Sequence, residues 1–384
     1  MPTLITARRL ITDIGSVEFP VLIVDDDGAL TDISSDPTAL AREEDTLTCA
    51  FFDVHTHGAM GHDVMSASPA EMREIQRFLA LRGVAQYLPT TVTASVDSTL
   101  RALESLANAI EGQPQPLQAQ PRGIHLEGPF LSHAKRGVHP ENHLQTPSIE
   151  LFDRFQQAAR GHISLLTIAP ELSGAIDLIV YATSIGVRCS LGHTNALAAE
   201  AYAAVDAGAS SATHTFNAMR ALGHREPGVL GVALDDDRLF AELICDGVHV
   251  APELVRLWFK SKGPECGILI TDAMSAAGMP DGRYKLGEFD VDVAEGRAFL
   301  TGDLARGAHT LAGSVLTMDR AVANFCHFTG ATLADATRLA SHNPAAMLGR
   351  PELTRLAPGS AANLNRFDRS GRLVATYLQG ELVT

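Results

Sequence analysis

The chain has 384 residues, of which 46% are hydrophobic and 20% charged, a balance that is typical of globular proteins and excludes a largely disordered one. The net charge of −15 argues against general electrostatic attraction to nucleic acid or to an anionic membrane. The five cysteines are scattered without a CxxC motif, no secretory leader opens the chain, and no apolar run approaches the ~20 residues that cross a bilayer. We therefore expect a cytoplasmic protein with free thiols that has neither a nucleic-acid nor a membrane partner.

Both ends of the chain have the pattern of short strands. Residues 1–48 contain alternating runs such as TLITARRLI and FPVLIVDDDGALTDI, broken by glycine and aspartate, and residues 358–384 have the same character. Two β-rich ends around a different middle indicate one small sheet unit assembled from both termini. We predict a small β-sandwich domain built from residues 1–49 and 350–384.

The middle of the chain, residues 50–349, alternates between strand and helix patterns. Short apolar runs recur as AFFDVH, VAQYLPTT, RGIHLEG, ISLLTIAPE, VRCSLGH, SATHTFN, FAELICDG and CGILITDA. Stretches with helical spacing, such as PAEMREIQRFLALRG and LAAEAYAAVDAGA, lie between most of them. About eight strand–helix units predict a (β/α)8 barrel of the TIM type. An open doubly wound sheet is the alternative, but the chain lacks the GxGxxG turn that would favour it.

A second pattern follows the eighth run. Residues 282–303, GRYKLGEFDVDVAEGRAFLTGD, alternate between polar and apolar side chains around glycines, and they predict a hairpin inserted into the barrel.

Polar residues follow the predicted barrel strands at their carboxyl ends, where the active site of a barrel is built. They are His55, His57, Glu127, His193, His214, Asp246, His249 and Asp272. His55 and His57 are two residues apart, so their side chains leave the first strand on the same face. Histidines with a glutamate suit Zn²⁺ or Fe²⁺, and a catalytic site of this kind keeps one position open for water. Asp272 is then the candidate base that takes the proton of that water.

Each of these residues also has a reading without function. The HxH pair is on its own typical of a solvated strand end, Asp272 of a helix N-cap, and His214 of a satisfied core histidine. Their joint occurrence at successive strand ends favours a metal-dependent hydrolase.

Eight short motifs carry a resemblance to a known family. In chain order they are DVHTHG, HLEGPF, GHTNA, THTFNAM, REPG, DGVHV, TDAM and LAGS, spread over about residues 50–350. In this set the sequence resembles the N-acetylglucosamine-6-phosphate deacetylases of the amidohydrolase superfamily. HxH and TDA are shared across that superfamily, whereas HLEGP, THTFNAM with REPG, and DGVH are more specific to the deacetylases.

The resemblance implies roles for individual residues. The principal metal ligands would be Glu127, His193 and His214, Asp272 would act as base and acid, and His139 would lie beside the scissile carbonyl. The sugar phosphate would be held by Val138, His139, Asn217, Ala218, Arg225, His249, Leu311, Ala312 and Gly313. Arg225 and His249 would reach the phosphate across a subunit interface, which implies a homodimer.

A second metal ion is left open by the sequence. Some of the deacetylases lack the HxH pair and bind one ion, whereas this chain has His55 and His57. The predicted fourth strand, ISLLTIAPE, has no lysine that could be carboxylated to bridge two ions, so Glu127 is the remaining candidate bridge. We expect one or two divalent ions, with Zn²⁺ or Fe²⁺ favoured and cobalt or manganese also compatible with these ligands.

The expected reaction is hydrolysis of the acetamide of N-acetyl-D-glucosamine 6-phosphate. The alternatives are another amidohydrolase, such as an N-acetylgalactosamine-6-phosphate deacetylase or a cyclic-amide hydrolase, and a non-catalytic sugar-phosphate sensor. The motifs THTFNAM, REPG and DGVH argue against the cyclic amidases but do not separate gluco from galacto sugars. A sensor would need no base at Asp272, and metal storage would need no open site.

Overall fold

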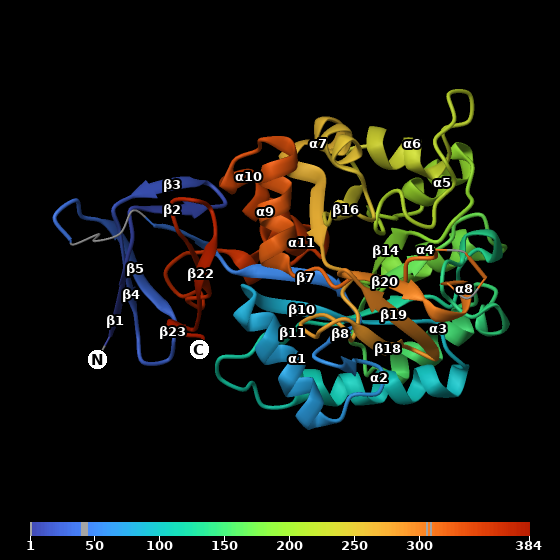
Figure 1. The fold of residues 1–384 in the computed structure, drawn as a ribbon, viewed down its shortest axis with the longest axis horizontal. Coiled ribbons are helices and arrows are strands. Elements are labelled where there is room, and N and C mark those ends of the chain that lie inside the picture. Colours follow the sequence, from blue (N-terminus) through green and yellow to red (C-terminus); the bar gives the residue numbers. More distant parts are fainter. Residues whose placement is uncertain (1, 40–44, 305, 308) are drawn as a thin grey trace.

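The computed structural model describes residues 2–39, 45–304, 306–307 and 309–384, and its larger part is a barrel (Figure 1). Within the described residues eight parallel strands run side by side in chain order. They are β7 (Phe51–Thr56), β10 (Val84–Thr91), β12 (Ile124–Glu127), β13 (Ile163–Ile168), β14 (Arg188–Leu191), β15 (Ser211–Ala212), β16 (Phe240–Ile244) and β17 (Gly267–Ile270). A two-residue strand, β11 (Gln120–Pro121), pairs with β10. The predicted (β/α)8 barrel is confirmed.

The barrel closes where the end of β7 meets the segment after β17. The N–H of Asp272 donates to the carbonyl of His55 at 2.9 Å, and the N–H of His57 donates to the carbonyl of Ala273 at 2.7 Å. This seam brings residues that are more than 200 positions apart in the chain to one point of the barrel mouth.

Helices cover the outside of the barrel. They are α1 (Pro69–Leu81), α2 (Val96–Glu111), α3 (Ile149–Ala158), α4 (Ala175–Ser184), α5 (Ala198–Asp206), α6 (Gly228–Asp235), α7 (Pro252–Cys266), α9 (Met318–Thr329), α10 (Leu333–Ala340) and α11 (His342–Met347). The first begins at a capping box in which Ser68 and Glu71 satisfy each other's backbone N–H, and its apolar face is buried against the barrel. The helices predicted from PAEMREIQRFLALRG and LAAEAYAAVDAGA are confirmed as α1 and α5.

The terminal segments form a separate pair of sheets, seen in dark blue and red in Figure 1. One sheet has the order β23 (Glu381–Leu382), β22 (Leu373–Leu378), β21 (Leu364–Phe367), β6 (Thr46–Cys49), β2 (Arg9–Thr12) and β3 (Gly15–Glu18). The other contains β1 (Thr3–Thr6), β4 (Pro20–Val24) and β5 (Leu30–Ser35). Leu10, Leu22, Leu47 and Leu364 from both sheets share one buried core. The β-sandwich built from both termini is confirmed, while the exact domain boundaries stay a prediction that includes residues 1 and 40–44, outside the described residues.

The segment after β17 forms a small sheet over the barrel mouth. Three antiparallel strands, β18 (Gly282–Leu286), β19 (Phe289–Ala294) and β20 (Arg297–Leu300), lead into the short helix α8 (Thr301–Leu304). The sheet buries its apolar side against Val92, Val138 and Met274 of the barrel loops. The predicted hairpin is therefore confirmed and has one more strand. A second small hairpin, β8 (Gly58–Ala59) with β9 (His62–Asp63), follows the first barrel strand.

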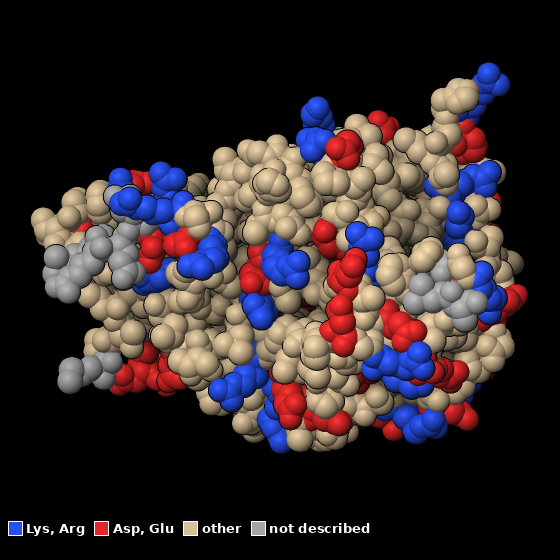
Figure 2. Space-filling model, in the orientation of Figure 1, with Lys and Arg blue, Asp and Glu red and all other residues tan. Residues whose placement is uncertain are grey.

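Charges are mixed on the molecular surface. On the face shown in Figure 2, blue and red side chains alternate over the barrel and the terminal sheets. None of the helices in the described ranges is long and apolar enough to pass through a bilayer.

Candidate active site and metal centre

A cavity of about 300 Å³ opens at the carboxyl ends of the barrel strands. Its lining contains most of the residues selected from the sequence: His57, Glu127, Val138, His139, His193, His214, Asn217, Ala218, His249, Asp272, Leu311 and Gly313. His55 is fully buried beside it, Ala312 is buried next to two lining residues, and Arg225 is exposed outside the lining.

The backbone is unusual where the chain leaves the barrel strands. His193, His214, Ala218 and Asp272 all have positive φ, between 29° and 50°, although none of them is glycine. Such a conformation is unfavourable for a residue with a Cβ and concentrates at functional positions. Here it turns each residue out of its strand direction at the rim of the cavity.

Three atoms at the cavity floor form a triangle. His193 Nε2 and His214 Nε2 lie 3.2 and 3.1 Å from Glu127 Oε1, and they lie 3.0 Å from each other. Ligand atoms at about 2.0–2.1 Å from a tetrahedral zinc ion lie about 3.3 Å apart, so the triangle has the size of one face of such a site. Two imidazole nitrogens 3.0 Å apart need a shared proton or a cation between them. The donor set therefore fits a divalent metal ion.

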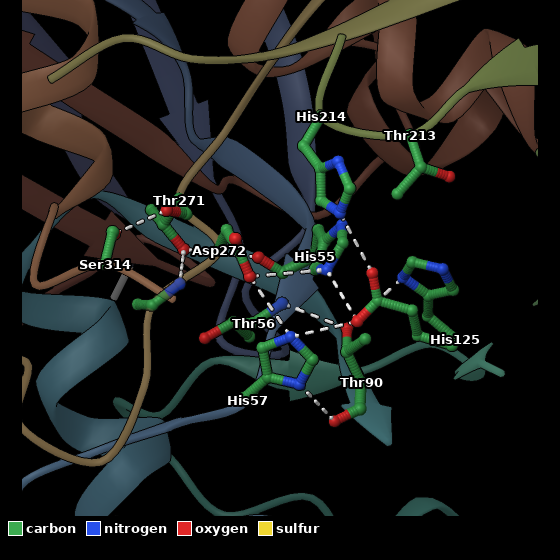
Figure 3. Close-up of polar contacts among 12 residues, drawn as sticks. His55, Thr56, His57, Thr90, His125, Thr213, His214, Thr271, Asp272 and Ser314 are labelled. Atoms are coloured by element: carbon green, nitrogen blue, oxygen red, sulfur yellow. Dashed lines mark hydrogen bonds and ion pairs between the residues drawn. The ribbon is translucent and has the colours of Figure 1, made fainter. Parts of the chain in front are cut away.

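The other oxygen of Glu127 faces a second group of ligands. Glu127 Oε2 lies 3.5 Å from His55 Nε2 and 3.3 Å from His57 Nε2. Asp272 Oδ1 lies 3.5 and 3.1 Å from the same two nitrogens. Figure 3 shows His55, His57 and Asp272 facing one another, with His214 on the far side of His55. One carboxylate thus stands between two groups of nitrogen donors, as a bridge between two ions would.

Hydrogen bonds set which ring nitrogen of His57 and of His193 is free for a metal. His57 Nδ1 donates to the carbonyl of Thr90 at 3.0 Å, and His193 Nδ1 donates to the carbonyl of Lys135 at 3.1 Å. In the neutral form of each ring, which is the form that binds a metal, the Nε2 atom therefore directs its lone pair toward the cavity. His55 Nε2 is buried without a hydrogen-bond partner among the described residues, as expected of an atom that binds a metal ion.

His139 has the opposite tautomer and is not a ligand of the same kind. The backbone N–H of Thr93 donates to its Nδ1 at 3.2 Å, so in the neutral ring the proton sits on Nε2. Burial and the neighbouring His193 hold the pKa of His139 well below its usual value. Although His139 lies close enough to Glu127 and His193 to be grouped with them, it is a neutral hydrogen-bond donor, and His214 is the better third ligand.

The site demands positive charge. Burial disfavours the imidazolium forms, but Glu127 and Asp272 outweigh it and raise the pKa of His57 to about 9 and that of His55 well above its usual value. Burial also opposes ionisation of the two carboxyl groups, yet the histidines hold the pKa of Glu127 and of Asp272 well below the usual range. Two buried carboxylates are therefore stabilised by protons on the imidazoles, and a metal ion can replace those protons.

The opposite wall of the cavity suits a polar ligand. His249 donates from Nδ1 to Asp246 Oδ2 at 2.7 Å, and its backbone N–H donates to the other oxygen of Asp246 at 2.8 Å. Burial opposes protonation, but the bond to Asp246 raises the pKa of His249 above its usual value. This ring lines the cavity of its own chain, which differs from the implied position across a subunit interface.

The segment between β15 and α6, which contains Arg225, forms a loop that projects from the barrel at the upper right of Figure 1. Glu226 anchors the loop, because its Oε1 accepts the backbone N–H groups of Ala198 at 3.0 Å and Gly228 at 3.2 Å. The loop therefore has a fixed base with Arg225 exposed, and its tip is basic in Figure 2.

Some site residues were not identified from the sequence. Leu286, His309 and Thr310 line the cavity from the inserted sheet and the segment after it, and Val92 lines it from the loop after β10. These side chains have no distinctive motif, and only the placement of the inserted sheet over the barrel mouth brings them there. The fully buried Glu242 was also missed, although a carboxylate within the apolar run FAELI was a visible signal.

The sequence and the fold were compared with known proteins. The amidohydrolase family model matches residues 46–383. The N-acetylgalactosamine-6-phosphate deacetylase of Escherichia coli O157:H7 is 37% identical, with both chains covered completely. The N-acetylglucosamine-6-phosphate deacetylase of Bacillus subtilis strain 168 is 38% identical over 80% of this chain and 77% of the relative.

Among solved structures, a mutant N-acetyl-D-glucosamine-6-phosphate deacetylase of Mycobacterium smegmatis in complex with N-acetyl-D-glucosamine 6-phosphate is similar over the full length. It is 35% identical, with a TM-score of 0.92, and the alignment covers 100% of this chain and 99% of the other. Because the family match spans nearly the whole chain and both the Escherichia coli relative and the Mycobacterium smegmatis structure align end to end, the chain belongs to the amidohydrolase family of metal-dependent hydrolases.

Proposed function

We propose that the protein hydrolyses the acetamide of N-acetyl-D-glucosamine 6-phosphate to D-glucosamine 6-phosphate and acetate. The observation that carries this proposal is the cavity itself, where the triangle of Glu127, His193 and His214 lies beside the carboxylate of Asp272. The similarity to N-acetylglucosamine-6-phosphate deacetylases over most of the chain supports the choice of substrate.

Glu127, His193 and His214 would hold the principal divalent ion, and His55 and His57 with Asp272 would hold a second one on the other oxygen of Glu127. Zn²⁺ or Fe²⁺ is the expected metal, because imidazole and carboxylate suit both. A divalent ion bound there supplies Lewis acidity for the attacking water and the amide carbonyl.

The protein's own groups perform the proton transfers. Asp272 accepts a proton as the oxygen of water bonds to the carbonyl carbon, and His139 donates its Nε2–H to the developing oxyanion. Asp272 then delivers its proton to the amide nitrogen, the C–N bond breaks, and the amine leaves. The acetic acid that forms keeps the oxygen that came from water, and it loses its remaining hydroxyl proton to the free amine or to solvent as acetate, so atoms and charge balance.

The phosphate needs a guanidinium or ammonium partner, and the described lining of the cavity in one chain offers none. Neither lysine nor arginine is among the described residues that line it, and His249, Asn217 and the backbone near Gly313 remain as partners. We propose that Arg225 of a second copy supplies the guanidinium, which binds phosphate through two parallel hydrogen bonds. The protein would then act as a homodimer, with His249 contributed by the chain that owns the cavity.

Arg225→Ala should raise KM for the phosphorylated sugar about 10–100-fold, the loss expected for a charge-assisted bidentate contact. The KM for unphosphorylated N-acetylglucosamine should change by less than about 2-fold, because that sugar has no group for the guanidinium to bind. Steady-state kinetics on both sugars provide the measurement, with Arg154→Ala on α3 as an exposed-arginine control. Equal effects on both sugars would place the phosphate elsewhere.

Mixing two defective chains tests the shared site. A dimer of one Arg225→Ala chain and one Asp272→Asn chain contains one cavity with Asp272 and an arginine from the other copy. Random pairing should restore about a quarter of the wild-type sites at low substrate. No recovery from folded, mixed dimers would mean that Arg225 does not act across the interface.

The activity itself is tested by acetate release from metal-loaded protein. The substrates are N-acetylglucosamine 6-phosphate, N-acetylgalactosamine 6-phosphate and unphosphorylated N-acetylglucosamine. We expect the fastest release from the phosphorylated gluco sugar. Faster release from the galacto sugar would assign the protein to the specificity of its Escherichia coli relative. No release from any of the three would refute the deacetylase proposal.

A further inference from the structure

The carboxylate of Glu242 lies beneath the metal-binding groups and has no role in the reaction described above. It comes from β16, its side chain is fully buried, and it points into the barrel. Its Oε2 lies 3.2 Å from His55 Nδ1 and accepts the backbone N–H of His214 at 3.2 Å. Its Oε1 is buried without a hydrogen-bond partner among the described residues. Burying a carboxylate with one oxygen that has no hydrogen bond lowers the stability of the fold, so a functional reason for this residue is expected.

The contact between Glu242 and His55 decides which nitrogen of the His55 ring carries the proton. A carboxylate can only accept, so His55 Nδ1 carries the proton and donates it to Glu242. In the neutral ring the lone pair is then on Nε2, the atom that lies 3.5 Å from both Glu127 Oε2 and Asp272 Oδ1 and has no hydrogen-bond partner in the described residues. Glu242 thus orients His55 toward the second group of ligands.

His55 differs in this respect from the other candidate ligands. The rings of His57 and His193 donate to neutral carbonyls, those of Thr90 and Lys135. Of the candidate ligands, His55 is the one whose Nδ1 contacts a carboxylate in the described structure. A carboxylate behind a ligating imidazole raises its basicity and fixes its orientation.

The negative charge around His55 also favours a second metal ion. Three carboxylates, those of Glu127, Asp272 and Glu242, lie within 3.5 Å of His55. With the three ionised, a single divalent ion would leave this buried group with a net charge of −1, whereas a second divalent ion would make it positive and so match an anionic substrate.

We infer that Glu242 is a positioning residue that makes His55 a ligand and so sets the affinity of the second metal ion. This inference rests on the metal centre of the proposed function and assigns to Glu242 the difference between a one-ion and a two-ion site. The residue acts through His55 and does not touch the substrate cavity.

Metal titration of the stripped protein tests the inference without any substrate. Zn²⁺ is added in competition with a chromogenic chelator, which gives the number of ions and a dissociation constant for each. Wild type should bind two ions. Glu242→Gln keeps the shape and an acceptor oxygen but removes the charge, and it should weaken the second ion about 10–100-fold and the first by less than about 3-fold. Loading with Mn²⁺ adds a second readout, because the spin coupling between two neighbouring ions should disappear from the spectrum of the variant.

Two further variants separate positioning from folding. Ser190→Ala changes a buried barrel residue that contacts Thr213 and not His55, and it should leave both affinities as in wild type. Glu242→Asp keeps the charge and should bind the second ion more tightly than Glu242→Gln, even if both variants are less stable than wild type.

Three results would overturn the inference. One is a wild-type protein that binds a single ion at any concentration, another is an equal loss of both ions in Glu242→Gln, and the third is two ions bound by that variant as tightly as by wild type. Because these titrations contain no sugar, they can fail while acetate release succeeds, and the deacetylase proposal would then stand without the role of Glu242.

Discussion

Asp272→Asn should lower kcat for acetate release about 1000-fold or more, within the range of 10²–10⁴ that a positioned acid–base group contributes and at its upper end because one residue serves both steps. The carboxylate is nearly buried, lies at the barrel seam and points into the cavity next to His57. An asparagine of the same shape cannot accept the proton of the attacking water or return it to the amine. KM should change by less than about 5-fold, because the contacts that we propose for the sugar phosphate come from other residues.

Metal analysis separates the base from a ligand. The principal ion, for which we propose Glu127, His193 and His214 as ligands, should stay bound in Asp272→Asn, and the loss of turnover should persist when metal is in excess. Asp45→Asn is a matched control, since Asp45 is also a buried aspartate but belongs to the terminal sandwich and pairs with Arg366. Turnover of Asp272→Asn within 10-fold of wild type would remove Asp272 from the proton transfers.

Sequence patterns predict the barrel and the heart of the site for one physical reason. In a closed parallel barrel every strand ends at the same rim, so a polar residue that follows each apolar run must point to a common centre. His55, His57, Glu127, His193 and Asp272 follow this rule, and in the structure each of them has a side-chain nitrogen or oxygen within 3.5 Å of another member of the group. His214 follows it although β15 is only two residues long, because the positive φ at His214 turns the chain at the rim.

The strand-end rule does not predict the residues that lie behind the histidine rings and fix their orientation. Whether a histidine presents Nδ1 or Nε2 depends on what lies behind the ring, and the partners come from distant strands and loops: Glu242 for His55, Thr90 for His57 and Thr93 for His139. The same holds for Leu286 and His309, which reach the cavity only because an inserted sheet packs over the barrel mouth. Such contacts are set by tertiary packing, and no local pattern encodes them.

Removing the metal should abolish turnover and also lower the melting temperature, by an amount that grows with pH. In the metal-free protein, Glu127 and Asp272 raise the pKa of His57 to about 9 against the opposing effect of burial. A raised pKa in the folded state stabilises the fold fully below the unfolded value near 6.5, and this contribution is lost as pH rises through about 9. The metal-free protein should therefore melt at lower temperatures as pH increases from about 6.5 to 9.

The stabilisation that bound metal gives should instead increase with pH. Metal ions and protons compete for the same histidine nitrogens, and fewer protons compete at higher pH. With Zn²⁺ at about 1000 times its dissociation constant, binding adds about 4 kcal/mol to the stability of the folded state. Thermal melts at pH 6.5, 7.5 and 8.5 measure the difference in melting temperature between the stripped and the Zn²⁺-loaded protein. His57→Asn supplies the control, since it removes the titrating ring and should flatten the pH dependence of the stripped protein. If this difference in melting temperature decreases as pH rises, the imidazoles do not exchange protons for metal. The argument that the buried carboxylates of the centre require a cation would then be wrong.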